Sequence, residues 1–178
     1  MILKYVATAL TAAMLAVVAV VGATAAEPQR AEAAVGVQVA ACGGGNVDLS
    51  VEEKKMLDLH NKTRAERGLP KFCVHPDLQR AARAHSKEML AEDRFVHGNV
   101  DERLRGFGYR WSTSGENIAG GSGPYRTPEN RFKAWMNSSG HRANILNKNV
   151  QEIGIGVHTG TYKGYGNWMM WTVDFGDR

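Results

Sequence analysis

The sequence predicts an α+β domain with three or four helices around a small antiparallel sheet. Most of the chain after its first quarter carries helix signals, with apolar residues at three- and four-residue spacing behind capping residues or prolines. The C-terminal part differs, because Ile153, Ile155 and Val157 alternate with small or polar residues and an aromatic stretch follows at 168–175. Alternation of this kind is typical of half-buried strands. Together these two patterns give the α+β class.

The N-terminal segment differs in composition from the rest of the 178 residues. Lys4 carries its only charge, an apolar run spans 5–21, and the small residues at 23–25 form a cleavage-like site. This pattern is typical of a secretory signal peptide, so we expect residues 1–26 to be removed on export. An uncleaved anchor is the alternative, although the run barely reaches the roughly 17 to 20 residues that a membrane span needs. We expect a secreted or cell-envelope-associated protein with no stable membrane span after cleavage.

The remaining chain has the length of one domain. Residues 27–47 alternate alanine with valine before three glycines, which favours a flexible leader. Residues 48–178 then form a single domain of a size that supports its own core. The net charge of +4 is mild, and the basic residues are scattered without interleaved aromatics. We therefore expect no nucleic-acid partner.

Two cysteines, Cys42 and Cys73, lie in the part of the chain that we expect to be exported. An oxidising compartment would allow them to pair, and the bond would tie the N-terminal segment to the domain. Small residues precede Cys42, so lipidation of that cysteine is an alternative to pairing.

The expected helices follow in order along the domain. Ser50 and Glu53 form a capping box that predicts a helix to about Arg67, with a stop at Gly68. Pro76-Asp77 begins a second helix that fades at 93–94, and 101–106 make a short helical turn. The cap Thr127 with its following proline begins another helix, which ends at 139–140, and 141–146 form a short turn or helix. Residues 71–74 are strand-like, 116–119 are a brief strand or turn, and 159–167 form the loop of the C-terminal hairpin.

Polar residues that packing alone does not explain concentrate between positions 114 and 146. Glu116-Asn117 and His141-Arg142 are each set among small residues, which predicts a cleft lined by Glu116 and His141. His97 lies at a helix-to-loop junction directly before a glycine, so its ring is open to approach. By contrast, His60-Asn61 on the first helix and His85 in the apolar stripe of the second favour structural roles over catalysis or metal binding.

Several motifs occur in one order across 49–176, and together they resemble the CAP superfamily, which includes cysteine-rich secretory proteins, antigen 5 and plant pathogenesis-related proteins. The nearest likeness is to its bacterial, secreted SCP-domain branch. The motifs are His60-Asn61-x-x-Arg64, Phe95-x-His97, Gly115-Glu116-Asn117-Ile118, Trp135 with Gly140-His141-Arg142-x-Asn144-Ile145-Leu146, Glu152-Ile153-Gly154, and a terminal Trp-x-x-Asp-Phe-Gly.

The resemblance implies an α-β-α sandwich with a central cleft that holds two histidines and two acids in eukaryotic members. Carried over by position, the cleft residues are His97, Glu116 and His141, and the position of the second acid is Ser138. His97 and His141 would hold a divalent metal, with zinc as the expected ion. Motif residues expected to support the cleft are His60, Asn61, Asn117, Arg142 and Asn144.

Two functions follow from these residues. Two imidazoles and a carboxylate match the ligands of zinc sites that keep an open position for water, so a metal-assisted hydrolase acting on peptide or cell-envelope material is one interpretation. Glu116 could equally accept hydrogen bonds from His141 and from backbone amides. Because Ser138 replaces an acid and no nucleophile is evident, we favour a binding or interaction protein whose cleft holds a metal, a lipid or a peptide.

Overall fold

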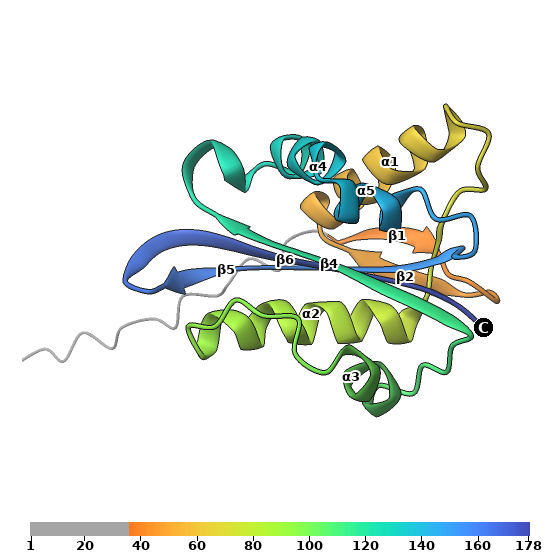
Figure 1. Ribbon diagram of the computed structural model, residues 1–178. Coiled ribbons are helices and arrows are strands. Elements are labelled where there is room, and N and C mark those ends of the chain that lie inside the picture. Colours follow the sequence, from red (N-terminus) through yellow and green to blue (C-terminus); the bar gives the residue numbers. More distant parts are fainter. Residues whose placement is uncertain (1–35) are drawn as a thin grey trace, which may run out of the picture. The chain divides into compact units, whose positions relative to one another are not determined.

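The computed structural model describes residues 36–178, in which a four-stranded sheet is packed between two helical layers (Figure 1). The strand order is β3-β5-β6-β4. Helices α2 and α3 cover one face, and α1, α4 and α5 cover the other (Figure 1). This arrangement confirms the predicted α+β sandwich. The expected signal peptide, 1–26, lies outside the described residues.

The sheet is built on two long antiparallel strands, β5 (Glu152–Tyr162) and β6 (Tyr165–Asp177). β6 also pairs antiparallel with β4 (Thr113–Gly121), which forms one edge. At the other edge, the two-residue β3 (Cys73–Val74) runs parallel to β5, so the sheet is mixed and not purely antiparallel as expected. The predicted loop at 159–167 is also too long, because the strands continue to a tight turn at Lys163 and Gly164, both with positive φ.

Helix α2 (Pro76–Ala91) lies directly on β5, and α3 (Val100–Gly106) packs beside it. Glycines at two alternate positions of β5 make this close approach feasible. A Cβ atom on Gly154 would lie 2.1 Å from the main-chain carbon of Leu78, and one on Gly156 would lie 2.2 Å from that of Ala82. The glycines that interrupt the apolar alternation of this strand are therefore the contact surface for a helix backbone.

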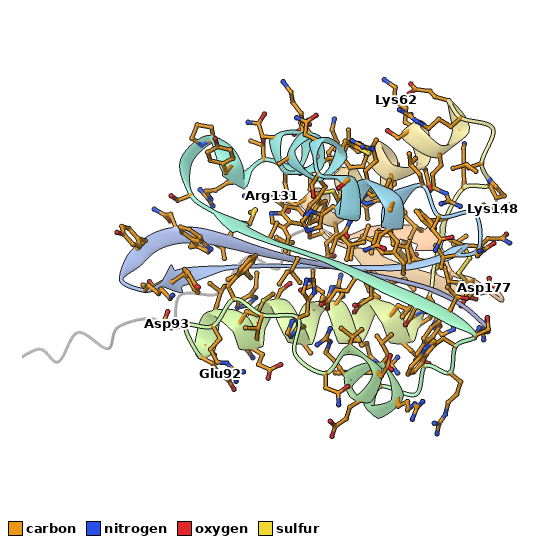
Figure 2. The ribbon with its side chains drawn as sticks, in the orientation of Figure 1. Lys62, Glu92, Asp93, Arg131, Lys148 and Asp177 are labelled. Atoms are coloured by element: carbon orange, nitrogen blue, oxygen red, sulfur yellow. A yellow bond between two sulfur atoms is a disulfide. The ribbon has the colours of Figure 1, made fainter. Side chains whose placement is uncertain are left out.

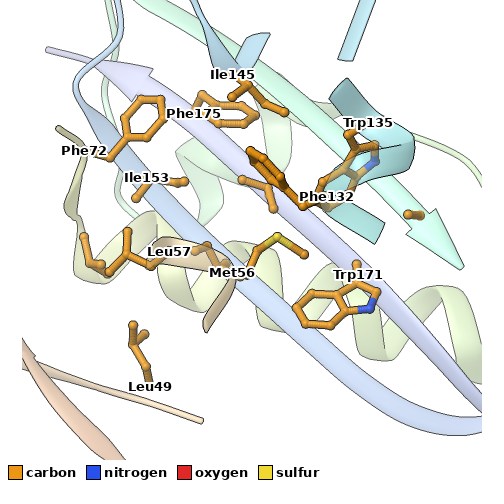
Figure 3. Packing of buried hydrophobic residues seen from close by; sticks show 14 of the residues in the cluster. Leu49, Met56, Leu57, Phe72, Phe132, Trp135, Ile145, Ile153, Trp171 and Phe175 are labelled. Carbon is orange, nitrogen blue, oxygen red and sulfur yellow. The ribbon is translucent and has the colours of Figure 1, made fainter. Parts of the chain in front are cut away.

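The opposite layer contains α1 (Val51–Ala65), α4 (Pro128–Asn137) and α5 (Ser139–Ile145), with the short 3-10 helix η1 (Gly123–Arg126) before α4. The capping box at Ser50 and Glu53 is present. The larger core lies under these helices, where Met56, Phe132, Trp135 and Trp171 pack together (Figure 3). The described residues hold five α-helices, one more than the upper expectation, because α5 is a separate helix.

The segment expected to be a flexible leader is partly structured. Strands β1 (Val37–Ala40) and β2 (Asn46–Leu49) pair as a hairpin around the three glycines, all of which have positive φ. Cys42 in this hairpin is bonded to Cys73 in β3, so it has no thiol free for lipidation. The expectation of a flexible leader does not hold for 37–47, because valine alternates with other residues in both strands and glycine supplies the turn between them.

Arg64 holds the end of α1 against the chain that leads into β5. Its side chain is fully buried and donates to the carbonyl oxygens of Pro70, Ile145, Asn147 and Val150 at 2.7 to 3.0 Å. The guanidinium also lies 3.9 Å from the ring centroid of Phe72. A buried cation is thus compensated by carbonyl dipoles and one aromatic face.

No helix within 36–178 is long and apolar enough to cross a membrane.

Candidate functional site

An open cleft of about 570 Å³ lies along the edge strand β4, between the loop after α2 and helices α4 and α5. Two of the three predicted cleft residues, His97 and His141, line it. The full lining consists of Phe95, Val96, His97, Ile118, Ala119, Gly120, Arg131, Ala134, Trp135, Ser138 and His141. Residues from the loop after α2, from β4 and from α4 and α5 therefore meet at one site.

Glu116, the third predicted residue, lies behind His97 and does not line the cleft. Its side chain is only 2% exposed, and its Oε1 lies 2.6 Å from Nδ1 of His97. Its other oxygen accepts from Nη2 of Arg103, and Nη1 of the same arginine donates to the carbonyl of His97 at 3.0 Å. With the carboxylate as acceptor, Nδ1 of His97 carries the proton and Nε2 is left with a free electron pair.

A second buried acid, Asp174, faces Glu116 across the β4–β6 ladder. Burial raises the pKa of Glu116 to about 7, although the Arg103 guanidinium opposes the increase. Burial and the adjacent charge of Glu116 raise the pKa of Asp174 well above its ordinary value. Because Arg103 offers one positive charge to two carboxyl groups, the pair retains a proton near neutral pH.

His141 is held by the residue at the position of the missing acid. Its Nδ1 lies 2.9 Å from the hydroxyl of Ser138, and its carbonyl oxygen accepts from the side chain of Asn117 at 3.1 Å. Asn144 donates to both the side-chain oxygen of Asn117 and the carbonyl of Glu116. The two asparagines therefore tie α5 to β4 and fix the backbone that carries the histidine.

The other residues expected to support the cleft lie elsewhere. His60 is fully buried among aromatic rings in the core, with Nδ1 2.8 Å from the carbonyl of Met56. Asn61 exchanges two hydrogen bonds with the backbone of Phe72, and Arg142 is exposed and bonds the end of α4. His85 is a hydrogen-bonded core histidine, as expected, with Nε2 2.9 Å from the carbonyl of Val96.

His97 and His141 would offer a divalent metal at most two protein ligands. Nδ1 of each ring is engaged within the protein, so the Nε2 atoms of His97 and His141 are the donors left for the cleft. At His141 this requires Nδ1–H to donate to the Ser138 hydroxyl. No group of three or more His, Cys, Asp or Glu side chains is placed to hold a metal within the described part of the chain. Glu116 is not counted as a third ligand, because its side chain is only 2% exposed and it does not line the cleft.

Three charged residues of this region were missed in the sequence: Arg103, Asp174 and Arg131. Arg103 lies in a short helix with no sequence motif. Asp174 stands inside the terminal Trp-x-x-Asp-Phe-Gly motif, and an aspartate in an otherwise apolar strand was a signal that could have identified it. Arg131 is one turn before Trp135 on α4, where a basic residue on a surface helix attracts no attention.

Comparisons of the sequence agree with this architecture. The family described as "CAP: Cysteine-rich secretory protein family" matches residues 57–175. An uncharacterized protein of Bacillus subtilis, YkwD, is 39% identical over 133 residues, covering 71% of this chain and 48% of the relative. An uncharacterized membrane protein of the same organism, YlbC, is 32% identical over 113 residues, covering 61% of this chain and 32% of the relative. The chain thus spans about half or less of the curated relatives that it matches.

Solved structures show the same fold. An extracellular SCP-domain protein of Bacillus anthracis superposes with a TM-score of 0.61 at 26% identity, covering 71% of this chain and 40% of that one. An outer surface protein of Borrelia burgdorferi superposes with a TM-score of 0.63 at 17% identity, covering 80% of this chain and 98% of that one. The family model matches most of the described domain, and the B. subtilis and B. anthracis relatives support that match. The chain belongs to the CAP family of cysteine-rich secretory proteins.

Proposed function

We propose that this chain is a secreted or cell-envelope-associated binding protein whose cleft along β4 holds its ligand. The observation that carries the proposal is the state of the cleft: two imidazoles line it, while the neighbouring carboxylate is withdrawn into contacts with Arg103 and His97. Such a site presents ligand-binding groups without a free carboxylate to act as a general base.

The proposed location is supported by the Cys42–Cys73 bond, since disulfides persist in oxidising compartments. The signal-peptide pattern of the first 26 residues agrees with it. The B. anthracis structure is described as extracellular and the B. burgdorferi protein as an outer surface protein.

A divalent metal, with zinc as the preferred ion, is part of the proposal, and its ligands are Nε2 of His97 and Nε2 of His141. Neutral imidazole is a common zinc ligand, and the Glu116 contact orients His97 as outer hydrogen bonds orient metal-binding histidines. The metal would supply Lewis acidity to whatever group occupies the remaining coordination positions. The alternative function, a metal-assisted hydrolase acting on peptide or cell-envelope substrates, lacks a free carboxylate base among the described lining residues.

Zinc uptake by the purified protein tests the site. Equilibrium dialysis should show zinc bound by the wild type, with loss of binding in His97→Ala and in His141→Ala. His158→Ala is the matched control, because His158 is exposed on β5 and does not line the cleft. Equal uptake by the wild type and the double variant would refute the assignment. Turnover of a peptide or cell-wall substrate that requires both histidines would instead establish the hydrolase.

A further inference from the structure

The edge strand β4 presents main-chain groups to the cleft. Among the described strands it pairs only with β6, so alternate residues direct their N–H and C=O groups away from the sheet. Three side chains identify these residues: Asn144 donates to the carbonyl of Glu116, Trp135 to that of Ile118 and Arg131 to that of Gly120, at 2.9 to 3.2 Å. The residues with outward groups are therefore Glu116, Ile118 and Gly120.

Side chains satisfy the outward carbonyl groups of β4 but not its outward N–H groups. The outward carbonyls each have a side-chain donor, whereas the N–H groups of Ile118 and Gly120 face away from β6 and have no acceptor among the described residues. Both residues line the cleft. Along a strand, residues two apart are separated by about 6.8 Å, which is also the repeat of the carbonyl groups on one side of an extended peptide. The cleft thus presents hydrogen-bond donors at the spacing of a β-strand and has its acceptors occupied.

The charge of the cleft favours an anionic occupant. None of the described lining residues is acidic, and the one with a permanent charge is Arg131. Arg131 is only 9% exposed, and its hydrogen bonds go to the carbonyl oxygens of Gly120 and Tyr125. Its Nε has no partner in the described part of the chain. The guanidinium also lies 5.8 Å from the ring centroid of Tyr125, so carbonyl oxygens and one aromatic face partly stabilise its charge. No carboxylate among the described residues pairs with it, and an anionic ligand would supply one. In Figure 2, Arg131 lies between α4 and β4.

We propose that the cleft binds an extended peptide ending in a free carboxylate, which lies along the edge of β4 with its terminal carboxylate towards Arg131. The N–H groups of Ile118 and Gly120 donate to carbonyl oxygens of the peptide, while the outward carbonyls of β4 keep their side-chain donors. The contact is therefore one half of the hydrogen-bond pattern of β-strand addition. His97 and His141 lie beside the bound segment. This inference rests on the proposed binding function, because it names the ligand class of the same cleft.

Three ligands test the proposal on the wild-type protein, so no substitution can disturb its folding. N-acetylated tetra-alanine with a free carboxylate, the same peptide as its C-terminal amide, and decanoate are titrated into ¹⁵N-labelled protein while amide resonances are followed. The acid should shift the Ile118 and Gly120 amides and bind at least about tenfold more tightly than the amide, because a charge-assisted hydrogen bond is lost. Equal affinities of acid and amide would overturn the role of the carboxylate. If decanoate binds and neither peptide does, the ligand is not a peptide and the proposal is wrong.

Two variants test whether Arg131 is the residue that recognises the terminal carboxylate. Arg131→Gln keeps an amide donor for the two carbonyls and removes the charge, so the preference for the acid over the amide should disappear. Lys133→Gln, an exposed position on the same helix, is the matched control and should keep the preference. Retention of the preference in Arg131→Gln with core resonances unchanged would overturn the assignment. If no peptide or fatty acid shifts the cleft amides but zinc still shifts the two histidines, this inference fails while the metal site stands. If none of the peptides, decanoate or zinc shifts any resonance of the cleft, both this inference and the metal site are wrong.

Discussion

His60 should make the protein's stability fall between neutral pH and about pH 4. The ring is fully buried, with Phe132 at 4.9 Å and Trp135 at 6.2 Å between ring centroids. Its Nε2 has no hydrogen-bond partner among the described residues. Burial lowers the pKa of His60 to about 4, and the Arg64 charge acts in the same direction. The imidazole is therefore neutral in the folded state at every pH well above that value.

The sign of the effect follows from proton binding in the two states. Below about pH 6.5 the unfolded chain takes up a proton at this histidine, and the folded protein does not until about pH 4. Stability from this group is thus complete above pH 6.5 and decreases as the pH falls towards 4. The two pKa values differ enough to remove about 3 kcal/mol from the free energy of unfolding over that range.

Urea unfolding of the wild type and His60→Gln at a series of pH values measures the effect. The glutamine amide is a neutral donor for the Met56 carbonyl, and it does not titrate. Other buried histidines and acids also respond to pH, but they are present in both proteins and cancel in the difference. The stability advantage of the wild type should shrink by about 3 kcal/mol between pH 7 and 4. Parallel pH profiles of the wild type and His60→Gln would refute the argument.

Three further changes test the scaffold by chemical denaturation. Arg64→Met should cost about 3 kcal/mol or more, because four buried carbonyl oxygens lose their donor; a loss below about 1 kcal/mol would show that water replaces it. Gly156→Ala should cost about 3 kcal/mol, since its Cβ would meet helix backbone, whereas Gly140→Ala, with open space around it, should be nearly neutral. Opening the Cys42–Cys73 bond, whose cysteines are 31 residues apart, should cost about 3.5 kcal/mol, and unchanged unfolding under reducing conditions would contradict this.

The sequence predicted the elements that depend on local patterns. The capping box at Ser50, the proline at 76 and the Thr127 cap each mark a helix start that the structure contains. It failed where partners distant in the chain decide the outcome. A brief strand or turn was expected at 116–119, but β4 is nine residues long because β6 pairs along its whole length, and nothing within 113–121 encodes that partner. The hairpin at 37–49 was missed because alternating alanine and valine also suit an unstructured segment.

In the candidate site too, local patterns indicate some of the residues, whereas residues distant in the chain decide the position of others. His97 and His141 were predicted to share a cleft, and the structure places both in one lining. The prediction that Glu116 lines it as well rested on its position between small residues. Those residues belong to a strand that buries the glutamate beside Asp174, with Arg103 as its counter-ion. A pattern in one segment identifies a polar group, but the charges that decide its role come from other elements.

The placement of the acids and bases decides the chemistry that the cleft favours. Arg103 binds Glu116 behind the histidines, so the negative charge of that residue is compensated inside the protein. Arg131 has no such counter-ion among the described residues, and it lines the cleft together with two imidazoles and two residues of β4 whose amides face outward. A site whose acid has a counter-ion and whose arginine has none attracts anions, and a divalent metal on the histidines would add to that attraction. Metal binding and carboxylate binding are therefore compatible in one cleft. The metal would add positive charge, and the outward N–H groups of β4 would orient the bound peptide.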